Sequence, residues 1–175
     1  MDKIIGPHLS NSKGYMNIID EMKIINANTF QFFTRNPRGT KAKELNIEDV
    51  NNFKKEWKEL GNLDFVAHAP YTYNLCSSKK DLRELTIRLM DDDLKRLNIL
   101  ECPYYNFHPG SHTGQGSFVA INQISEAINT LFDKNKDSKT TLLLETMAGK
   151  GTEVGKTFEE LSQIIDKIDN KNKIG

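Results

Sequence analysis

The chain has 175 residues, a length that predicts a single domain with a sizeable buried core. Its 24 basic and 24 acidic side chains balance, which argues against a global positive field and leaves DNA binding dependent on a local basic face. The two cysteines, Cys76 and Cys102, form no Cys-x-x-Cys pair, and no apolar run approaches the ~18 residues of a membrane span. We therefore expect a cytoplasmic protein that does not enter a membrane.

Short apolar runs, each followed by a polar residue, recur along the chain. From the second run onward they are about 35 to 40 residues apart, which leaves room for a strand, a helix and two loops. The runs are Ile4-Ile5, Phe30–Phe33, Phe65–Ala67, Tyr104–Phe107 and Leu142–Leu144. The polar residues after them are His8, Thr34, His68, His108 and Glu145. We interpret the runs as five strands.

Apolar residues at steps of three and four fill the gaps and predict helices with one buried face. The five stripes run through Tyr15–Ile25, Val50–Leu60, Leu82–Leu97, Ile121–Leu131 and Phe158–Ile168. The last helix begins at a capping box, Thr157 with Glu160 three residues on. Strands that alternate with helices predict a parallel sheet with right-handed crossovers.

The fold class is therefore α/β, and the spacing favours a (β/α)8 TIM barrel. A complete barrel takes ~250 residues, so we expect residues 1–175 to form a single partial barrel domain that holds about the first five βα units. The segment Asn170–Gly175 resembles the loop into a sixth strand. An open, doubly wound five-stranded sheet is the alternative.

Two imidazoles and a carboxylate stand at equivalent strand ends. Polar groups at the carboxyl ends of parallel barrel strands meet at one face, where such folds keep their chemistry. Neutral imidazole suits zinc, manganese and iron, so His68 and His108 are candidate metal ligands. Glu145 follows four strand-forming residues, and a buried carboxylate must be paired or metal-bound. A salt bridge from Glu145 to a lysine is the competing interpretation.

Other polar motifs carry weaker signals. The loop 148–157 ends in Gly-Lys-Thr, but its glycine spacing departs from that of a phosphate-binding P-loop by one residue, which argues against nucleotide binding. Arg35 and Arg38 form either a solvated pair or phosphate contacts, and Tyr71 suits stacking on a base or sugar. His8 and His112 are interpreted as supporting or plain polar residues.

Five stretches of the chain together resemble the endonuclease IV family of apurinic/apyrimidinic endonucleases, in the family's order and over the whole 175 residues. They are Ile5–Ser10, Phe32–Arg38, His68–Tyr71, Asn106–His112 and Leu144–Gly151. The His-x-x-Tyr stretch and the Asn-Phe-His-Pro-Gly stretch are specific in combination.

The resemblance implies a TIM barrel with a trinuclear zinc cluster that cleaves the phosphodiester 5′ to an abasic site and leaves a 3′-hydroxyl. It implies that His68 and His108 are zinc ligands, and that Glu145 is a bridging carboxylate and the catalytic residue. Arg38 and Tyr71 would bind DNA at the lesion. The partner would be double-stranded DNA with abasic sites, and the complete protein a monomer.

The sequence departs from the family where its further ligands begin. The first of these lies in an aspartate-threonine-cysteine-histidine motif soon after a glycine that resembles Gly175. We therefore expect that residues 1–175 alone do not form an active endonuclease. The alternative enzyme is a divalent-metal sugar isomerase or epimerase of the xylose-isomerase-like barrels, which has no need for Arg38 and Tyr71 around an open groove. A non-catalytic DNA- or metal-binding fragment is the third possibility.

Overall fold

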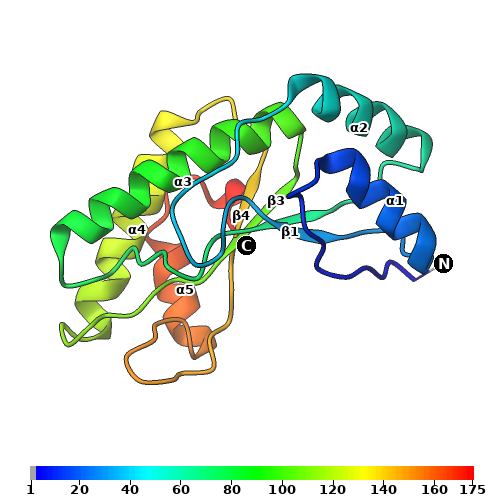
Figure 1. Ribbon diagram of the computed structural model, residues 1–175. Helices are drawn as coiled ribbons and strands as arrows, with labels where there is room; N and C mark the ends of the chain where they lie inside the picture. Colours follow the sequence, from blue (N-terminus) through cyan, green and yellow to red (C-terminus); the bar gives the residue numbers. More distant parts are fainter. Residues whose placement is uncertain (1–2) are drawn as a thin grey trace.

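The computed structural model describes residues 3–175 and contains one sheet of four parallel strands (Figure 1). The strands are β1 (Gln31–Phe33), β2 (Val66–His68), β3 (Tyr104–Phe107) and β4 (Thr141–Leu144). They lie in the sheet in the order in which they occur in the chain. Barrels have this order, whereas a doubly wound sheet reverses it at a switch point. The partial barrel is therefore confirmed.

The five expected helices are present. They are α1 (Tyr15–Ile25), α2 (Ile47–Glu59), α3 (Lys80–Leu100), α4 (Ser117–Lys134) and α5 (Phe158–Asp166). In Figure 1, α1 lies beside α2, while α3, α4 and α5 form a second group, and these neighbours pack on one another. None of the helices in residues 3–175 is long and apolar enough to cross a bilayer.

The buried stripe of α3 differs from the prediction. We expected Leu82, Leu85 and Leu89 on the buried face, but these three side chains are only half-buried. Leu94 and Leu97 are buried as predicted, and Met90 and Asp93 are buried as well. The aspartate is accommodated on an apolar face because buried donors surround it, as described below.

The prediction of a full strand at Ile4-Ile5 is wrong. Ile4-Ile5 lies outside the strands of the sheet, and the only parallel bridge near it within residues 3–175 is between His8, three residues later, and Gln31 of β1. Pro7 has no amide hydrogen to donate, and the amide of Ile5 bonds to the Asn28 side chain instead of a strand. At the opposite edge Ile174 bridges Leu142 in parallel, as expected for the start of a further strand.

The sheet has one face covered by helices and one that is only partly covered. Along β3 and β4 buried and half-buried residues alternate, because successive side chains point to opposite faces. The partly covered face carries the row Phe33, His68, Asn106 and Leu143, which are register partners across the four strands. This row places His68 of β2 and Asn106 of β3, its two polar residues, side by side.

Candidate metal centre

His68, His108 and Glu145 come together at the carboxyl end of the sheet. His68 is the last residue of β2, while His108 and Glu145 directly follow β3 and β4. One ligand atom from each lies within 4.8 Å of the others, and this is the one such group that residues 3–175 offer. Strand spacing alone thus predicted the convergence correctly.

The hydrogen bonding of His68 prepares its ring for a cation. Nδ1 lies 2.6 Å from the carbonyl oxygen of Ala69, which can only accept, so Nδ1 carries the hydrogen. In the neutral ring Nε2 therefore holds a lone pair, and it faces Oε2 of Glu145 at 3.0 Å. Two electron pairs at this distance require a proton or a metal ion between them. Metal-bound histidines commonly show the same bond from the second nitrogen to a carbonyl.

The donor set also fits zinc in its dimensions. Tetrahedral zinc with bonds of about 2.0–2.2 Å separates its ligand atoms by roughly 3.3–3.6 Å. Oε2 of Glu145 lies 3.0 Å from Nε2 of His68 and 3.5 Å from Nε2 of His108. Small side-chain adjustments are therefore enough to hold one ion, with a coordination position left for water or substrate.

Glu145 is kept ionised by its neighbours. Burial raises the pKa of its carboxyl, but the His68 ring, the Asn106 amide and the His108 ring, which all face this carboxyl, outweigh burial, so the pKa lies below its usual value. Nδ2 of Asn106 donates to Oε2 at 2.5 Å. Asn106 was not among the predicted site residues, although its position two residues before His108 puts it on the same face of β3.

The two residues predicted to bind DNA lie in neighbouring loops. Tyr71 is 58% exposed, and its ring centroid lies 5.7 Å from that of His68 and 5.5 Å from that of His108. Arg38 is exposed in the loop after β1. The amide of Tyr71 donates to the carbonyl of Pro37, which joins the two loops. Tyr71 therefore covers the metal centre beside the loop of Arg38.

Both sequence interpretations of Arg35 are wrong. Its side chain is 3% exposed and lies between Asp92 and Asp93 of α3, so it is neither solvated nor free to meet a phosphate. Sequence analysis also missed Asp93. The signal was available, because Met90, Asp93, Leu94 and Leu97 follow the spacing of one helix face.

The remaining histidines and the glycine loop have structural contacts. Nδ1 of His112 accepts from the amides of Gly114 and Gly116 at the start of α4. His8 packs against Phe33 with the ring centroids 4.3 Å apart. In the loop 148–157, the carboxylate of Glu160 accepts from backbone amides before α5, the positions at which a P-loop would hold phosphate.

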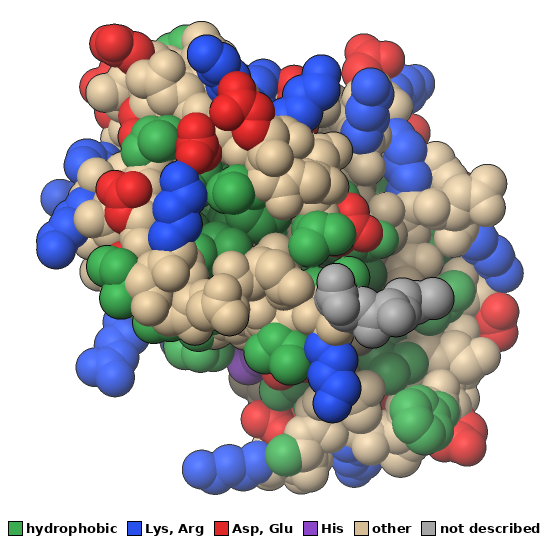
Figure 2. Space-filling model, turned by 90° about the vertical axis from the view of Figure 1, so that its right-hand side faces the viewer, with side chains coloured by type: hydrophobic (Ala, Val, Ile, Leu, Met, Phe, Trp, Pro, Cys, Tyr) green, Lys and Arg blue, Asp and Glu red, His purple; other side chains and the backbone are tan. Residues whose placement is uncertain are grey.

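A cavity of about 520 Å³ lies beside the metal centre and is lined by residues of the loops before α1 and after β1. His8 and Phe33 line it, and the Phe33 ring centroid lies 5.3 Å from that of His68; His68, His108 and Glu145 do not line it. On the face drawn in Figure 2, basic and acidic side chains are interspersed around exposed hydrophobic ones. This face therefore carries no field of one sign.

Comparisons with known proteins agree with this arrangement. Residues 19–175 match the family described as xylose isomerase-like TIM barrel. A probable endonuclease 4 of Clostridium botulinum (strain Alaska E43 / Type E3) is 51% identical over 171 residues, and one of Methanosphaera stadtmanae is 52% identical over 172. Each alignment covers 98% of this chain and 61% of the relative, so the chain spans about three-fifths of the length of these relatives.

Solved structures show the same fold. The crystal structure of endonuclease IV from Thermus thermophilus superposes with a TM-score of 0.81 at 28% identity, covering 93% of this chain and 59% of that one. A D-tagatose 3-epimerase-like protein superposes with a TM-score of 0.73 at 17% identity over 98% of this chain and 63% of that one, a likeness of fold alone. The chain therefore belongs to the xylose isomerase-like TIM barrel family, within which its curated relatives are endonuclease 4 proteins.

Proposed function

We propose that this chain supplies the first metal ligands and the DNA-contacting loops of a zinc-dependent repair endonuclease that cleaves the phosphodiester 5′ to abasic sites. The observation that carries the proposal is the convergence of His68, His108 and Glu145 beneath the exposed ring of Tyr71. The resemblance to endonuclease 4 proteins over 98% of the chain supports the same activity.

Each residue has a distinct proposed role. His68 and His108 would hold zinc together with the Glu145 carboxylate, whose Oε2 faces both rings. Because a carboxylate has two oxygens, Glu145 would serve as the bridging ligand and the catalytic carboxylate. Bound zinc supplies Lewis-acid activation of water and neutralises charge on the attacked phosphate. Asn106 holds the orientation of the carboxylate through its hydrogen bond.

Arg38 and Tyr71 are proposed to contact double-stranded DNA at the lesion. An exposed aromatic ring stacks on a base or fills the gap of a missing one, and an arginine in the adjoining loop meets phosphate. A sugar isomerase or epimerase has no use for either residue at an open rim. The epimerase likeness is one of fold alone, so it gives that activity no support.

Three ligands cannot fill the coordination of a multinuclear zinc cluster, since each zinc generally takes four. We therefore expect residues 1–175 to bind zinc and to cleave abasic duplex poorly or not at all. The test compares this chain with a chimera that adds the unmatched two-fifths of the C. botulinum relative. Zinc-dependent incision 5′ to the lesion by the chimera, and its loss on Glu145→Gln, are the expected results. A chimera that binds zinc yet does not distinguish abasic from intact duplex would refute the proposal.

A further inference from the structure

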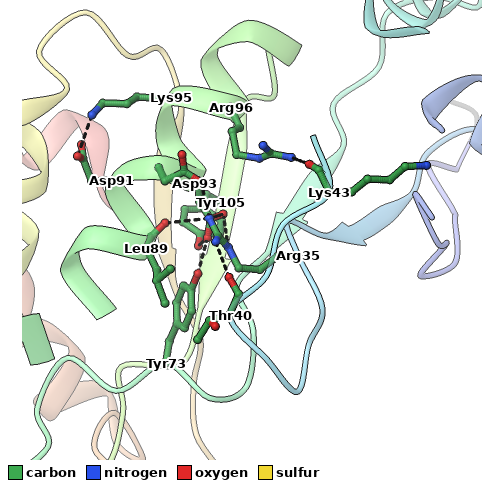
Figure 3. Close-up of polar contacts among 11 residues, drawn as sticks. Arg35, Thr40, Lys43, Tyr73, Leu89, Asp91, Asp93, Lys95, Arg96 and Tyr105 are labelled. Atoms are coloured by element: carbon green, nitrogen blue, oxygen red, sulfur yellow. Dashed lines mark hydrogen bonds and ion pairs between the residues drawn. The ribbon is translucent and has the colours of Figure 1, made fainter. Parts of the chain in front are cut away.

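A buried charged network joins α3 to Arg35 and Tyr73, which belong to the loops that carry Arg38 and Tyr71 (Figure 3). Its centre is Asp93 of α3, whose side chain is 0% exposed, with the Arg35 guanidinium on one oxygen and two tyrosine hydroxyls on the other. Every polar contact of this carboxylate is to a buried side chain. The network shares no residue with the candidate metal centre, whereas Tyr73 and Tyr105 also pack in the apolar core.

Arg35 ties down the loop that carries Arg38. The guanidinium donates to Oδ1 of Asp93 at 2.6 and 2.9 Å and to Asp92 at 2.7 Å. It also donates to the carbonyl of Thr40 at 2.8 Å. Arg38 thus lies between Arg35 and Thr40 in the sequence. The Arg35 guanidinium bonds to Thr40 and to Asp93, so it holds both ends of this segment. Burial lowers the pKa of Arg35, but the adjacent Asp93 outweighs it, so the pKa lies above its usual value and the side chain stays charged.

Tyr73 ties down the loop that carries Tyr71. Its hydroxyl donates to Oδ2 of Asp93 at 2.9 Å, and its amide bonds to the carbonyl of Pro70. Tyr71 lies between these two anchored residues and donates its own amide to Pro37 in the first loop. The buried carboxylate of Asp93 therefore holds one residue of each loop, Arg35 and Tyr73, and the two loops are joined to each other by the hydrogen bond from Tyr71 to Pro37.

We propose that the Asp93 network is a positioning device for lesion recognition. Through Arg35 and Tyr73 it sets the places of Arg38 and Tyr71 relative to each other and to the metal centre, while none of its members touches DNA. This inference rests on the proposed function for its DNA contacts. The rigidity of the two loops is a separate claim that can be measured without DNA.

A second tyrosine provides a matched control. Tyr105 of β3 donates to the same Oδ2 atom at 2.7 Å, and it belongs to a strand and not to either loop. Tyr73→Phe and Tyr105→Phe each delete one buried hydroxyl bond to the same carboxylate oxygen. They differ because Tyr73 belongs to a loop that is proposed to contact DNA, whereas Tyr105 does not. Asp93→Asn is less useful, because it leaves the buried guanidinium with only the exposed Asp92 as its counter-charge and endangers folding itself.

The experiment uses the 175-residue chain with zinc and measures two quantities for each variant. The first is hydrogen exchange at the amide of Tyr71. The second is affinity for a duplex with a tetrahydrofuran abasic analogue, measured by fluorescence anisotropy. A hydrogen bond to a charged group contributes ~1.5–3 kcal/mol, so Tyr73→Phe is expected to speed exchange and weaken binding by about tenfold or more. Tyr105→Phe is expected to lower the global free energy of unfolding by a similar amount. It should leave hydrogen exchange at Tyr71 and affinity for the abasic duplex unchanged.

The outcomes separate this inference from the proposed function. Equal effects of the two substitutions on Tyr71 exchange would show that the network is merely structural and overturn the inference. If the chimera with the C. botulinum residues does not prefer abasic over intact duplex, the proposed function fails, and exchange at Tyr71 in the 175-residue chain still decides whether the network positions the loop. Faster exchange in Tyr73→Phe alone, together with weaker abasic binding, supports both.

Discussion

Asn74 and Ser111 join the loops after β2 and β3 through two opposed hydrogen bonds. Oδ1 of Asn74 accepts from the amide of Ser111 at 3.1 Å, and Nδ2 donates to the carbonyl of Ser111 at 2.9 Å. The oxygen also accepts from the amide of Cys76. Ser111 lies three residues after His108, so these hydrogen bonds hold in place the loop that follows this candidate metal ligand.

Gly110 is expected to be irreplaceable at this joint. Its φ is +120°, and a Cβ there would lie 2.4 Å from Oδ1 of Asn74. Gly61 shares a positive φ, +106°, but has open space around it. Gly61→Ala should cost only the ~1–2 kcal/mol of the strained backbone, whereas Gly110→Ala adds ~1–3 kcal/mol of overpacking. Urea unfolding measures the free energy of unfolding of both variants. Equal losses would mean that the Asn74 side chain moves away from the new methyl group without cost.

Removing a predicted ligand should abolish tight zinc binding while another histidine is dispensable. His68→Ala is expected to weaken zinc affinity by more than the roughly 10–100-fold typical of outer-shell changes, because a direct bond is lost. His112→Ala removes an imidazole that bonds only to loop amides, and it should leave zinc affinity unchanged. Competition with a chromogenic chelator measures both affinities, and equal affinities would exclude His68 as a ligand.

Asn106 is expected to tune the centre without binding metal. Asn106→Ala deletes the amide bond to Oε2 of Glu145 and should weaken zinc binding by roughly 10–100-fold. Asn17→Ala breaks a comparable amide–carboxylate bond, to Glu21 on α1, and serves as the control. Isothermal titration with zinc decides the matter: unaltered affinity in Asn106→Ala would show that Glu145 is oriented by the histidines alone.

Tyr71→Ala should weaken binding to abasic duplex by ~1–3 kcal/mol, the usual contribution of an aromatic stacking platform. The matched substitution is Tyr104→Ala, which removes a ring at the amino end of β3, where its hydroxyl meets Asp64. Anisotropy titrations of both variants against abasic and intact duplex give the comparison. Should the two variants bind alike, Tyr71 does not contact the lesion.

The two thiols are expected to be inert in the folded protein. Cys76 and Cys102 are 0% and 1% exposed, and burial raises the pKa of each to about 12. Since free cysteine ionises near ~8.5, the unfolded chain loses these protons first. The free energy of unfolding should therefore fall as pH rises from about 8.5 towards 12. A chromogenic disulfide at pH 8 should react only upon unfolding, and rapid labelling of native protein would contradict this.

The pattern of elements and the end of the sheet that carries the candidate metal site follow from the order of residues alone. Short apolar runs locate β1 to β4, and stripes of apolar residues at steps of three and four locate the five helices, because a helix with one buried face has that period. Parallel strands of similar spacing bring their carboxyl ends together, which is why His68, His108 and Glu145 could be grouped without coordinates.

Contacts between distant segments, by contrast, emerge only in the folded molecule. Arg35 is an ion-pair residue because Asp93, 58 positions away, lies beneath it, and no local pattern encodes that pairing. Likewise, the strand expected at Ile4-Ile5 shrinks to a single bridge, because the amide of Ile5 bonds to Asn28 and not to a neighbouring strand. Periodicity reports which face of an element is buried, whereas the partner of a buried polar group depends on how elements far apart in the chain pack together.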